Sequence, residues 1–357
     1  MKKTIKWLEL KLGEEEINEV KQTLESGDIS GFSTKVKEFE RLAAEETGAR
    51  YALACANGTA ALITAFMAFK RYLKQNLIIA VPTWTYIAPV NAADLVGSVR
   101  LIDSDRKTFN ISTKLPKDVN LIAPVDMAGL PADYDSLREH NLPIVADAAE
   151  SMGARYKGRN VGTLADITIT SFHSSKVITT GEGGMIFTDN SELAQICENI
   201  INQGYGPKGY EEHYHVAKGF NFRMTGMQAA LGCVQIKKLR ELVGERQRKA
   251  KIYKDILGDK VEYPEVPEDV TSSYYSFLIL LPSRKKRDSL KEFLLKEGIE
   301  TKLWMPVHMQ PPYSHYPASE FPNANYIYEH HLRLPMHNLL TDEDIEYVAK
   351  KVLEGIE

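Results

Sequence analysis

The feature that most constrains the fold is a series of short apolar runs, separated by turn residues, in the first two thirds of the chain. Several runs are continuous rather than alternating, which is typical of strands covered on both faces. The runs are Leu77–Val81, Val99–Ile102, Leu121–Val125, Pro143–Ala146, Ile167–Phe172 and Met185–Thr188. Helical patterns lie between some of them, at Ala60–Lys74 and Asp133–His140. This alternation predicts an α/β layer structure around a mostly parallel sheet.

The pattern changes after a long helix that begins near Thr225. Thr225 and Gln228 have capping-box spacing, and we expect the helix to reach Leu257 with a break near Gly244. The elements expected beyond it are a strand at Tyr275–Leu281, a helix at Ser283–Lys296, a strand at Glu300–Met305 and a helix at Asp342–Leu353. The sequence therefore predicts a large domain at residues 1–240 and a smaller α+β domain at residues 241–357, which suits a chain of 357 residues.

Charge and cysteine content exclude several classes of protein. The formal net charge of −4 gives no general attraction to nucleic acid or to anionic membranes. The most apolar stretch, Tyr51 to Phe69, is interrupted by Asn57-Gly58-Thr59 and is no membrane span. Cys55, Cys197 and Cys233 form no CxxC pair, which fits a reducing compartment. We expect a soluble cytoplasmic protein that binds neither nucleic acid nor membrane.

The histidines do not predict a metal site. The close pairs are His213 with His215 and His330 with His331, and neither pair has a cysteine or a second acid at zinc-ligand spacing. We therefore expect no metal.

The first candidate for chemistry is Asn57-Gly58-Thr59, where a short apolar strand leads directly into a helix. Glycine allows close backbone approach, and the free N–H groups at a helix start favour an anion, typically a phosphate. A plain strand-to-helix turn is the alternative explanation.

The second candidate is Asp147, which directly follows the buried-looking run Leu142–Ala146. The carboxyl end of a parallel strand is where open α/β sheets place ligands. An acid there can pair with a protonated heterocycle such as a pyridinium nitrogen. The alternative is a carboxylate that caps a helix.

The third candidate is Lys176, in the Ser/Thr/Gly-rich segment Ser171–Gly184 between two expected strands. A lysine in such a place would lose solvation, have a lowered pKa and be able to form a Schiff base. The alternative is a solvated surface lysine. A phosphate cradle, an acid and a lysine in this chain order form a set that is far more specific than its parts.

With these motifs, the sequence resembles the DegT/DnrJ/EryC1/StrS family of aminotransferases, which act on keto-sugar nucleotides. The resemblance implies the PLP-dependent transferase fold type I (aspartate aminotransferase-like). The segments that carry it are Ser26–Phe39, Asn57–Leu62, Val81–Asn91, Asp147–Gly162, Ser171–Gly184, Gly219–Leu231 and Met305–Tyr313.

The resemblance assigns roles to the central residues. Lys176 matches the lysine that holds pyridoxal 5'-phosphate (PLP) as an internal aldimine and then moves a proton, with pyridoxamine phosphate (PMP) as the intermediate form. Asp147 matches the acid that keeps the pyridine nitrogen protonated. Gly58, Thr59 and Ser171 match the positions that bind the phosphate of the cofactor.

Further positions match at the rim of the site. Tyr86 matches the aromatic residue that stacks on the cofactor ring. Asn221 matches a residue that reaches the phosphate from a neighbouring subunit, so the resemblance implies a homodimer with shared active sites. His308 lies in a loop that the resemblance places near the sugar, which makes it a candidate substrate contact.

Some residues depart from the family pattern. Glu150 stands near the cofactor ring where Gln or His is often found. Gly226 replaces the usual Asp or Asn after the Arg-Met-Thr stretch. The segment Val125-Asp126-Met127-Ala128-Gly129 differs from the commoner Val-His-Leu-Tyr-Gly form, so contacts at that edge of the site are not implied by the resemblance.

The resemblance implies transfer of an amino group from an amino acid, L-glutamate, to a nucleotide-linked keto sugar in amino-sugar, lipopolysaccharide or other glycan biosynthesis. We expect a 4-keto-6-deoxy sugar, with C4 preferred over C3, while the nucleotide (UDP, dTDP or GDP) stays open. One alternative is a keto-cyclitol aminotransferase. Another is a PMP-dependent sugar dehydratase, which would carry His in place of Lys176. A non-catalytic regulatory protein on the same fold is a third.

Overall fold

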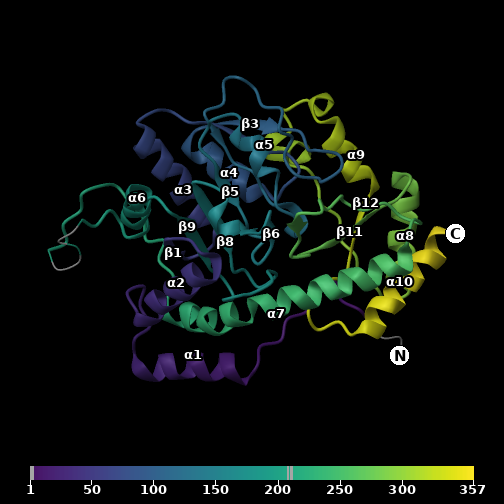
Figure 1. Ribbon diagram of the computed structural model, residues 1–357, viewed down its shortest axis with the longest axis horizontal. Helices are drawn as coiled ribbons and strands as arrows, with labels where there is room; N and C mark the ends of the chain where they lie inside the picture. The colour runs from purple at the N-terminus through teal and green to yellow at the C-terminus, as the bar shows by residue number, and fades with distance from the viewer. Residues whose placement is uncertain (1–3, 207–208, 210–211) are drawn as a thin grey trace.

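The computed structural model describes residues 4–206, 209 and 212–357, and a large twisted sheet lies at its centre (Figure 1). The strand order is β3-β2-β4-β5-β8-β9-β1, with β4 and β5 joined by the parallel bridges Ile122–Ile144 and Val125–Asp147. The strands are β1 (Tyr51–Cys55), β2 (Ile78–Pro82), β3 (Ser98–Ile102), β4 (Leu121–Ile122), β5 (Val145–Asp147), β8 (Ile167–Ser171) and β9 (Gly184–Thr188).

Strand β9 alone in this sheet runs against its neighbours. It is antiparallel to both β8 and β1, whereas β2 with β3, β2 with β4 and β5 with β8 are parallel pairs. Because the loop between β8 and β9 holds no crossover helix, β9 has to return antiparallel. The carboxyl ends of β1, β5 and β8 consequently meet at one edge, and the prediction of a mostly parallel α/β sheet is confirmed.

Helices cover both faces of the sheet, which explains the continuous apolar runs. In β9, Met185 and Phe187 pack toward α2 and α7, while Ile186 faces the opposite layer with α3. Small residues let α3 lie close to the strands. The helices of this part are α1 (Glu14–Ser26), α2 (Thr34–Thr47), α3 (Gly58–Leu73), α4 (Ile87–Val96), α5 (Tyr134–Arg138), α6 (Ser191–Ile201) and α7 (Gly226–Leu257).

Helix α7 is continuous from Gly226 to Leu257, so the expected break near Gly244 is wrong. Its start is as predicted, because Thr225 and Gln228 form the capping box. A Cβ on Gly244 would meet no atom within 4 Å, and a solvent-facing glycine costs a helix only about 1 kcal/mol relative to alanine, which the packing along α7 outweighs. Figure 1 shows α7 running beneath both halves of the molecule.

The carboxyl-terminal part packs around a two-stranded antiparallel sheet. Its helices are α8 (Arg284–Lys296), α9 (Pro322–His330) and α10 (Asp342–Ile356), and its strands are β11 (Phe277–Leu280) and β12 (His331–Leu334). A further small sheet joins β6 (Arg155–Tyr156), β7 (Arg159–Asn160) and β10 (Val270–Thr271). The strand expected at Glu300–Met305 is reduced to a single bridge between Lys302 and Arg333.

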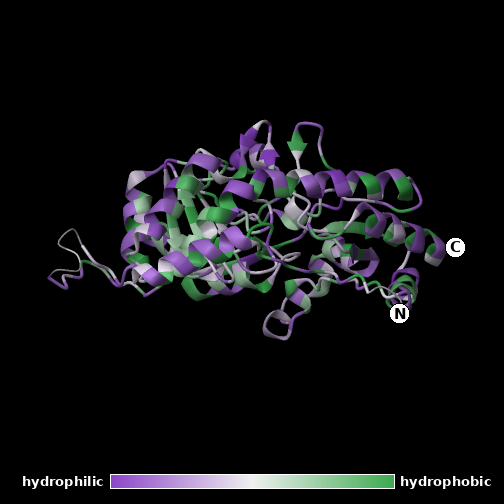
Figure 2. Cartoon of the chain, turned by 90° about the horizontal axis from the view of Figure 1, so that it is seen from below, coloured by the Kyte–Doolittle hydropathy of each residue, from purple (hydrophilic) through white to green (hydrophobic). Residues whose placement is uncertain are grey.

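The division into two domains at residue 240 stays a prediction. The predicted start of the large domain at residue 1, however, needs a correction. Ile5 is buried in the carboxyl-terminal core and forms a parallel bridge with Ile299, so this residue packs with the smaller part. Polar residues cover the outer helix faces in Figure 2, and none of the helices among the described residues is long and apolar enough to cross a bilayer.

His331, at the start of β12, is a buried histidine that holds two segments together. Its Nδ1–H donates to the carbonyl oxygen of Ile327 at 2.9 Å, and its Nε2 accepts from the backbone N–H of Trp304 at 2.9 Å. This arrangement requires a neutral ring, and burial lowers the pKa of His331 to about 3.

Replacement of His331 by Gln should make the protein less sensitive to acid. The unfolded chain binds a proton near the ordinary histidine pKa of 6.5, whereas folded His331 does not, so this residue stabilises above that pH and its contribution falls as the pH drops toward 3. The variant keeps an acceptor for Trp304 and should lose about 1–2 kcal/mol at pH 7.5. Urea unfolding at pH 7.5 and pH 5 measures the difference. The exposed His140 gives the control His140→Gln, and equal acid sensitivity in all three proteins would contradict the prediction.

Candidate active site

A cavity of about 1130 Å³ lies where the carboxyl ends of β1, β5 and β8 meet. Open α/β sheets bind ligands at this edge. The opposite wall comes from the carboxyl-terminal part, through Tyr275, Trp304 and Arg333. Of the residues expected in a site, the structure brings together Gly58, Thr59, Tyr86, Asp147, Glu150, Ser171 and Lys176.

The segment Asn57-Gly58-Thr59 forms a small cradle at the start of α3. The side-chain oxygen of Asn57 accepts from the N–H of Ala60 at 2.8 Å and so caps the helix. A Cβ on Gly58 would lie 2.9 Å from the Cβ of Ser171, so only glycine fits between α3 and the end of β8. Backbone N–H groups and the hydroxyls of Thr59 and Ser171 therefore surround a space suited to an anion.

Asp147 is the last residue of β5 and only 6% exposed. Its Oδ1 accepts from the N–H of Ala149 at 2.9 Å. Burial raises the pKa of Asp147 to about 6, and the charge of Lys176 opposes that rise. A desolvated carboxylate of this kind favours a positively charged partner in the cavity.

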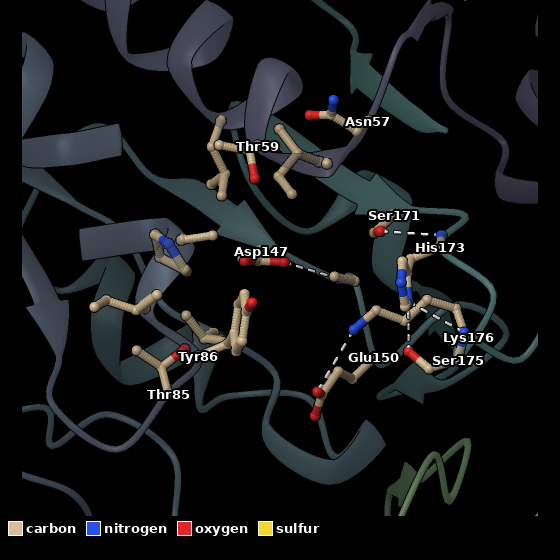
Figure 3. A pocket seen from close by; sticks show the side chains of 18 of the residues that line it. Asn57, Thr59, Thr85, Tyr86, Asp147, Glu150, Ser171, His173, Ser175 and Lys176 are labelled. Atoms are coloured by element: carbon tan, nitrogen blue, oxygen red, sulfur yellow. Dashed lines mark hydrogen bonds and ion pairs between the residues drawn. The ribbon is translucent and has the colours of Figure 1, made fainter. Parts of the chain in front are cut away.

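Lys176 lies in the β8–β9 loop and points into the same cavity as Asp147 (Figure 3). Its Nζ is 3.6 Å from Oε1 of Glu150 and 4.7 Å from the centre of the Tyr275 ring. Burial lowers the pKa of Lys176, but Tyr275, Glu150 and Asp147 together outweigh burial and raise it above its usual value. The expectation of a lowered pKa from lost solvation is thus wrong, because the sequence did not reveal these neighbours.

Glu150 is held by the segment in which the sequence departs from the family pattern. The N–H of Ala128 donates to Oε2 of Glu150 at 2.9 Å, which leaves Oε1 facing Lys176. Ala128 has a φ of 57°, a conformation unusual for a residue other than glycine. This conformation occurs in the turn that points the N–H of Ala128 toward Glu150. Residues 125–129 therefore position the carboxylate at this edge of the cavity.

Tyr86 and Asn221 are both exposed but differ in position. Tyr86 precedes α4, is 64% exposed and lines the cavity, where its ring is free to contact a planar ligand. Asn221 lies on the segment before α7 and forms an antiparallel β-bridge with Asn202, which follows α6. It is not among the residues that line this cavity.

The expectation that His308 contacts substrate needs correction. His308 is 2% exposed, and its ring nitrogens lie 2.7 Å from Oγ1 of Thr83 and 2.8 Å from Oδ1 of Asn325. Its ring also stacks on Phe321, and burial lowers its pKa. The cavity is lined instead by its neighbours Val307 and Gln310, so His308 holds the loop in place.

Sequence reasoning missed three residues of the wall formed by the carboxyl-terminal part. Tyr275, Trp304 and Arg333 lie far from the central motifs, and no spacing links them to Lys176. Arg333 alone could have been noticed, since a charged residue between Leu332 and Leu334 is unusual for a buried strand.

Fold and site together define a class: a three-layer α/β protein with a half-buried lysine and a buried acid beside a phosphate-type cradle. The sequence profile of the DegT/DnrJ/EryC1/StrS aminotransferase family matches residues 10–353. The chain belongs to this family of PLP-dependent aminotransferases, and its predicted fold type I is confirmed.

Relatives with named activities are similar over most of their length. The chain is 32% identical to a GDP-perosamine synthase of Escherichia coli O157:H7, covering 94% of each chain, and 34% identical to one of Caulobacter vibrioides, covering 90% of each. Among solved structures, PseC of Helicobacter pylori, an aminotransferase involved in pseudoaminic acid biosynthesis, is 25% identical with a TM-score of 0.91, covering 99% of both chains.

Structures of Spr1654 from Streptococcus pneumoniae carry the cofactor in two states. Its PLP form is 25% identical to this chain with a TM-score of 0.91, covering 99% of both chains, and a PMP form is also known. Within the described part of this chain, no group of three or more His, Cys, Asp or Glu side chains could hold a metal ion.

Replacement of Glu150 by Gln should lower the pKa of Lys176, because the ammonium loses the carboxylate 3.6 Å away. In the apoenzyme, the pH midpoint for modification of Lys176 by an amine-specific reagent should fall, and mass spectrometry of peptides locates the modified residue. Glu182→Gln is a matched control, because Glu182 lines the same cavity but pairs with His173. An unchanged or higher midpoint in Glu150→Gln would show that the pair does not set the protonation of Lys176.

Proposed function

We propose that this aminotransferase moves an amino group from L-glutamate to the keto group of a nucleotide-linked sugar. The observation that carries the proposal is the convergence of Lys176, Asp147 and the cradle at Gly58 in one cavity. The relatives named GDP-perosamine synthase support a sugar nucleotide as the acceptor.

The residues of the cavity fit PLP and PMP. The cradle of Gly58, Thr59 and Ser171 suits the phosphate, because a Cβ at Gly58 would fill it. Asp147, desolvated and with a raised pKa, gains a positive partner if it faces a protonated pyridine nitrogen. When bound, the cofactor supplies a carbonyl that exchanges amines and a ring that withdraws electrons.

Lys176 supplies the nucleophile and then the base. Its Nζ would hold the cofactor covalently, and once released it would hold and move a proton within the cavity. Attachment requires the neutral amine, so the proton that Lys176 retains beside Glu150 has to leave first. The exposed ring of Tyr86 is placed to stack on the cofactor and limit its movement.

The acceptor we propose is a 4-keto-6-deoxy sugar, aminated at C4. A cavity of about 1130 Å³ exceeds the usual volume of roughly 300–1,000 Å³ for a small-molecule site, which suits a cofactor together with a sugar nucleotide. We propose GDP as the nucleotide, on the names of the two relatives, and a role in glycan biosynthesis in the cytoplasm.

We also propose a homodimer in which Asn221 serves the cavity of the partner. Asn221 is exposed and lies beside exposed Phe220, so an apolar and a polar group face outward together. Since Asn221 does not line the cavity of its own chain, a second copy is what would bring it to a phosphate.

Lys176→Ala should lose both the covalent link and the reaction. The near-visible absorbance band of lysine-bound cofactor should disappear, and amine transfer should fall by at least about 10⁴-fold. Lys291→Ala, at an exposed position on α8, is the control and should keep both. Turnover or the absorbance band in Lys176→Ala, or a wild type that binds no PLP, would refute the proposal.

GDP should raise the melting temperature of the holoenzyme by roughly 5 °C near saturation, and UDP and dTDP by less, because a ligand of the folded state stabilises it. Mass spectrometry of a panel of keto-sugar nucleotides should then detect gain of an amine. A cyclitol aminotransferase would show no shift with any nucleotide, and loss of a hydroxyl without gain of nitrogen would identify a dehydratase.

A further inference from the structure

Asp126 is a carboxylate that is buried behind the cavity rather than in it. It is 0% exposed and is not among the residues that line the cavity. Its Oδ1 accepts a hydrogen bond from the N–H of Ala132 at 2.9 Å and another from the hydroxyl of Tyr134 at 2.9 Å. Its Oδ2 accepts from the hydroxyl of Ser151 at 2.6 Å. Three donors therefore converge on one side chain.

The histidine that is common in the family at this position could not make the same contacts. A carboxylate accepts hydrogen bonds on two oxygens, with about four lone-pair positions, whereas a neutral imidazole ring accepts on one nitrogen. Burial raises the pKa of Asp126 to about 7, while the three donors favour the charged form and limit that rise. Asp126 is thus a multiple acceptor that belongs to this chain rather than to the general family pattern.

Asp126 joins the two segments that hold Glu150. Its backbone N–H donates to the carbonyl oxygen of Asp147 at 3.0 Å, and the N–H of Asp147 donates to that of Pro124 at 2.9 Å. These bonds pair the ends of β4 and β5. The side chain of Asp126 then adds a contact farther along, to Ser151, which directly follows Glu150 in the sequence. Backbone and side chain together fix one segment against the other.

The turn that follows Asp126 carries the donor for the Glu150 carboxylate. The N–H of Ala128 donates to Oε2 of Glu150 at 2.9 Å, and Oε1 lies 3.6 Å from Nζ of Lys176 (Figure 3). Asp126 therefore holds both the turn that provides this N–H and the residue next to Glu150. A shift of Asp126 would move the donor and the acceptor relative to each other. The distance from Glu150 to Lys176 would change with them, and the energy of a charge pair depends on that distance.

We propose that Asp126 is a positioning residue, which holds Glu150 beside Lys176 and so keeps the reacting amine protonated. The inference rests on the proposed function only in naming Lys176 as the reacting amine. The titratable and charged groups that face Lys176 are Tyr275, Glu150, Asp147 and Arg333. Among these four, Glu150 has a carboxylate held by the turn after Asp126.

Two substitutions that each remove one hydrogen bond from Asp126 test this role. In the apoenzyme, the pH midpoint for modification of Lys176 by an amine-specific reagent should fall in Ser151→Ala, because the contact beside Glu150 is lost. It should stay unchanged in Tyr134→Phe, because that hydroxyl belongs to α5 and Asp126 keeps its contact with Ser151. Both variants should lower the urea midpoint of unfolding to a similar extent. A general loss of stability would therefore move the two pH midpoints alike.

Coupling between Asp126 and Glu150 gives a second measurement. Asp126→Asn replaces one acceptor oxygen by a donor, so the pH midpoint should fall. Combined with Glu150→Gln, it should lower the midpoint no further than Glu150→Gln does alone, because the carboxylate to be positioned is already absent. Asp133→Asn is the control and should keep the wild-type midpoint. Asp133 accepts from the hydroxyls of Tyr156 at 2.9 Å and Ser136 at 2.6 Å, but it is exposed and does not line the cavity.

The apoenzyme measurement separates this inference from the proposed function. An unchanged midpoint in Ser151→Ala, or an equal fall in Tyr134→Phe or Asp133→Asn, would overturn the role of Asp126. Ser151→Ala leaves Asp126 itself in place, so it decides the question even if Asp126→Asn does not fold. If wild type transfers no amino group, the proposed function fails, yet the midpoints still test Asp126. If wild type is active and the midpoints do not move, the assignment of Asp126 fails alone.

Discussion

The site depends on one constraint, the shared direction of β1, β5 and β8 in the central sheet. Each strand ends in a residue or turn that can bind a ligand or take part in a reaction. These are the cradle after β1, Asp147 at the end of β5 and Ser171 at the end of β8. Parallel pairing of β5 with β8, and the antiparallel return of β9, place these ends at one edge although they are far apart in sequence. The β8–β9 loop then brings Lys176 to the same place. Reversal of any one strand would remove its residue from the cavity.

Electrostatic balance within this cavity determines what the residues can do. Asp147, Glu150 and Arg333 are buried and line the same cavity as Lys176. Tyr275, Glu150 and Asp147 together raise the pKa of Lys176, while Asp147 itself has a pKa raised by burial and gains from a positive partner. Neutral donors at the cradle leave room for a phosphate. The charged side chains of the cavity are therefore able to pair with charged groups of a ligand.

Local patterns in the sequence predicted what depends on neighbours along the chain. Continuous apolar runs gave the covered strands, and the capping box of Thr225 and Gln228 gave the start of α7. The motifs at Gly58, Asp147 and Lys176 were found because each lies at a strand end. The break at Gly244, the raised pKa of Lys176 and the position of His308 could not be found this way. Each depends on packing between distant segments, such as Thr83 and Asn325 around His308.

The position of Trp7 has a consequence for the order of folding. Trp7 lies against Arg333, and Ile5 pairs with Ile299, so a segment that precedes the large sheet in the sequence packs against segments that follow it. Contacts of such long sequence separation form slowly, because a large loop has to close. We therefore expect the aromatic surroundings of Arg333 to form in a slow folding step, so that the cavity is complete only after that step.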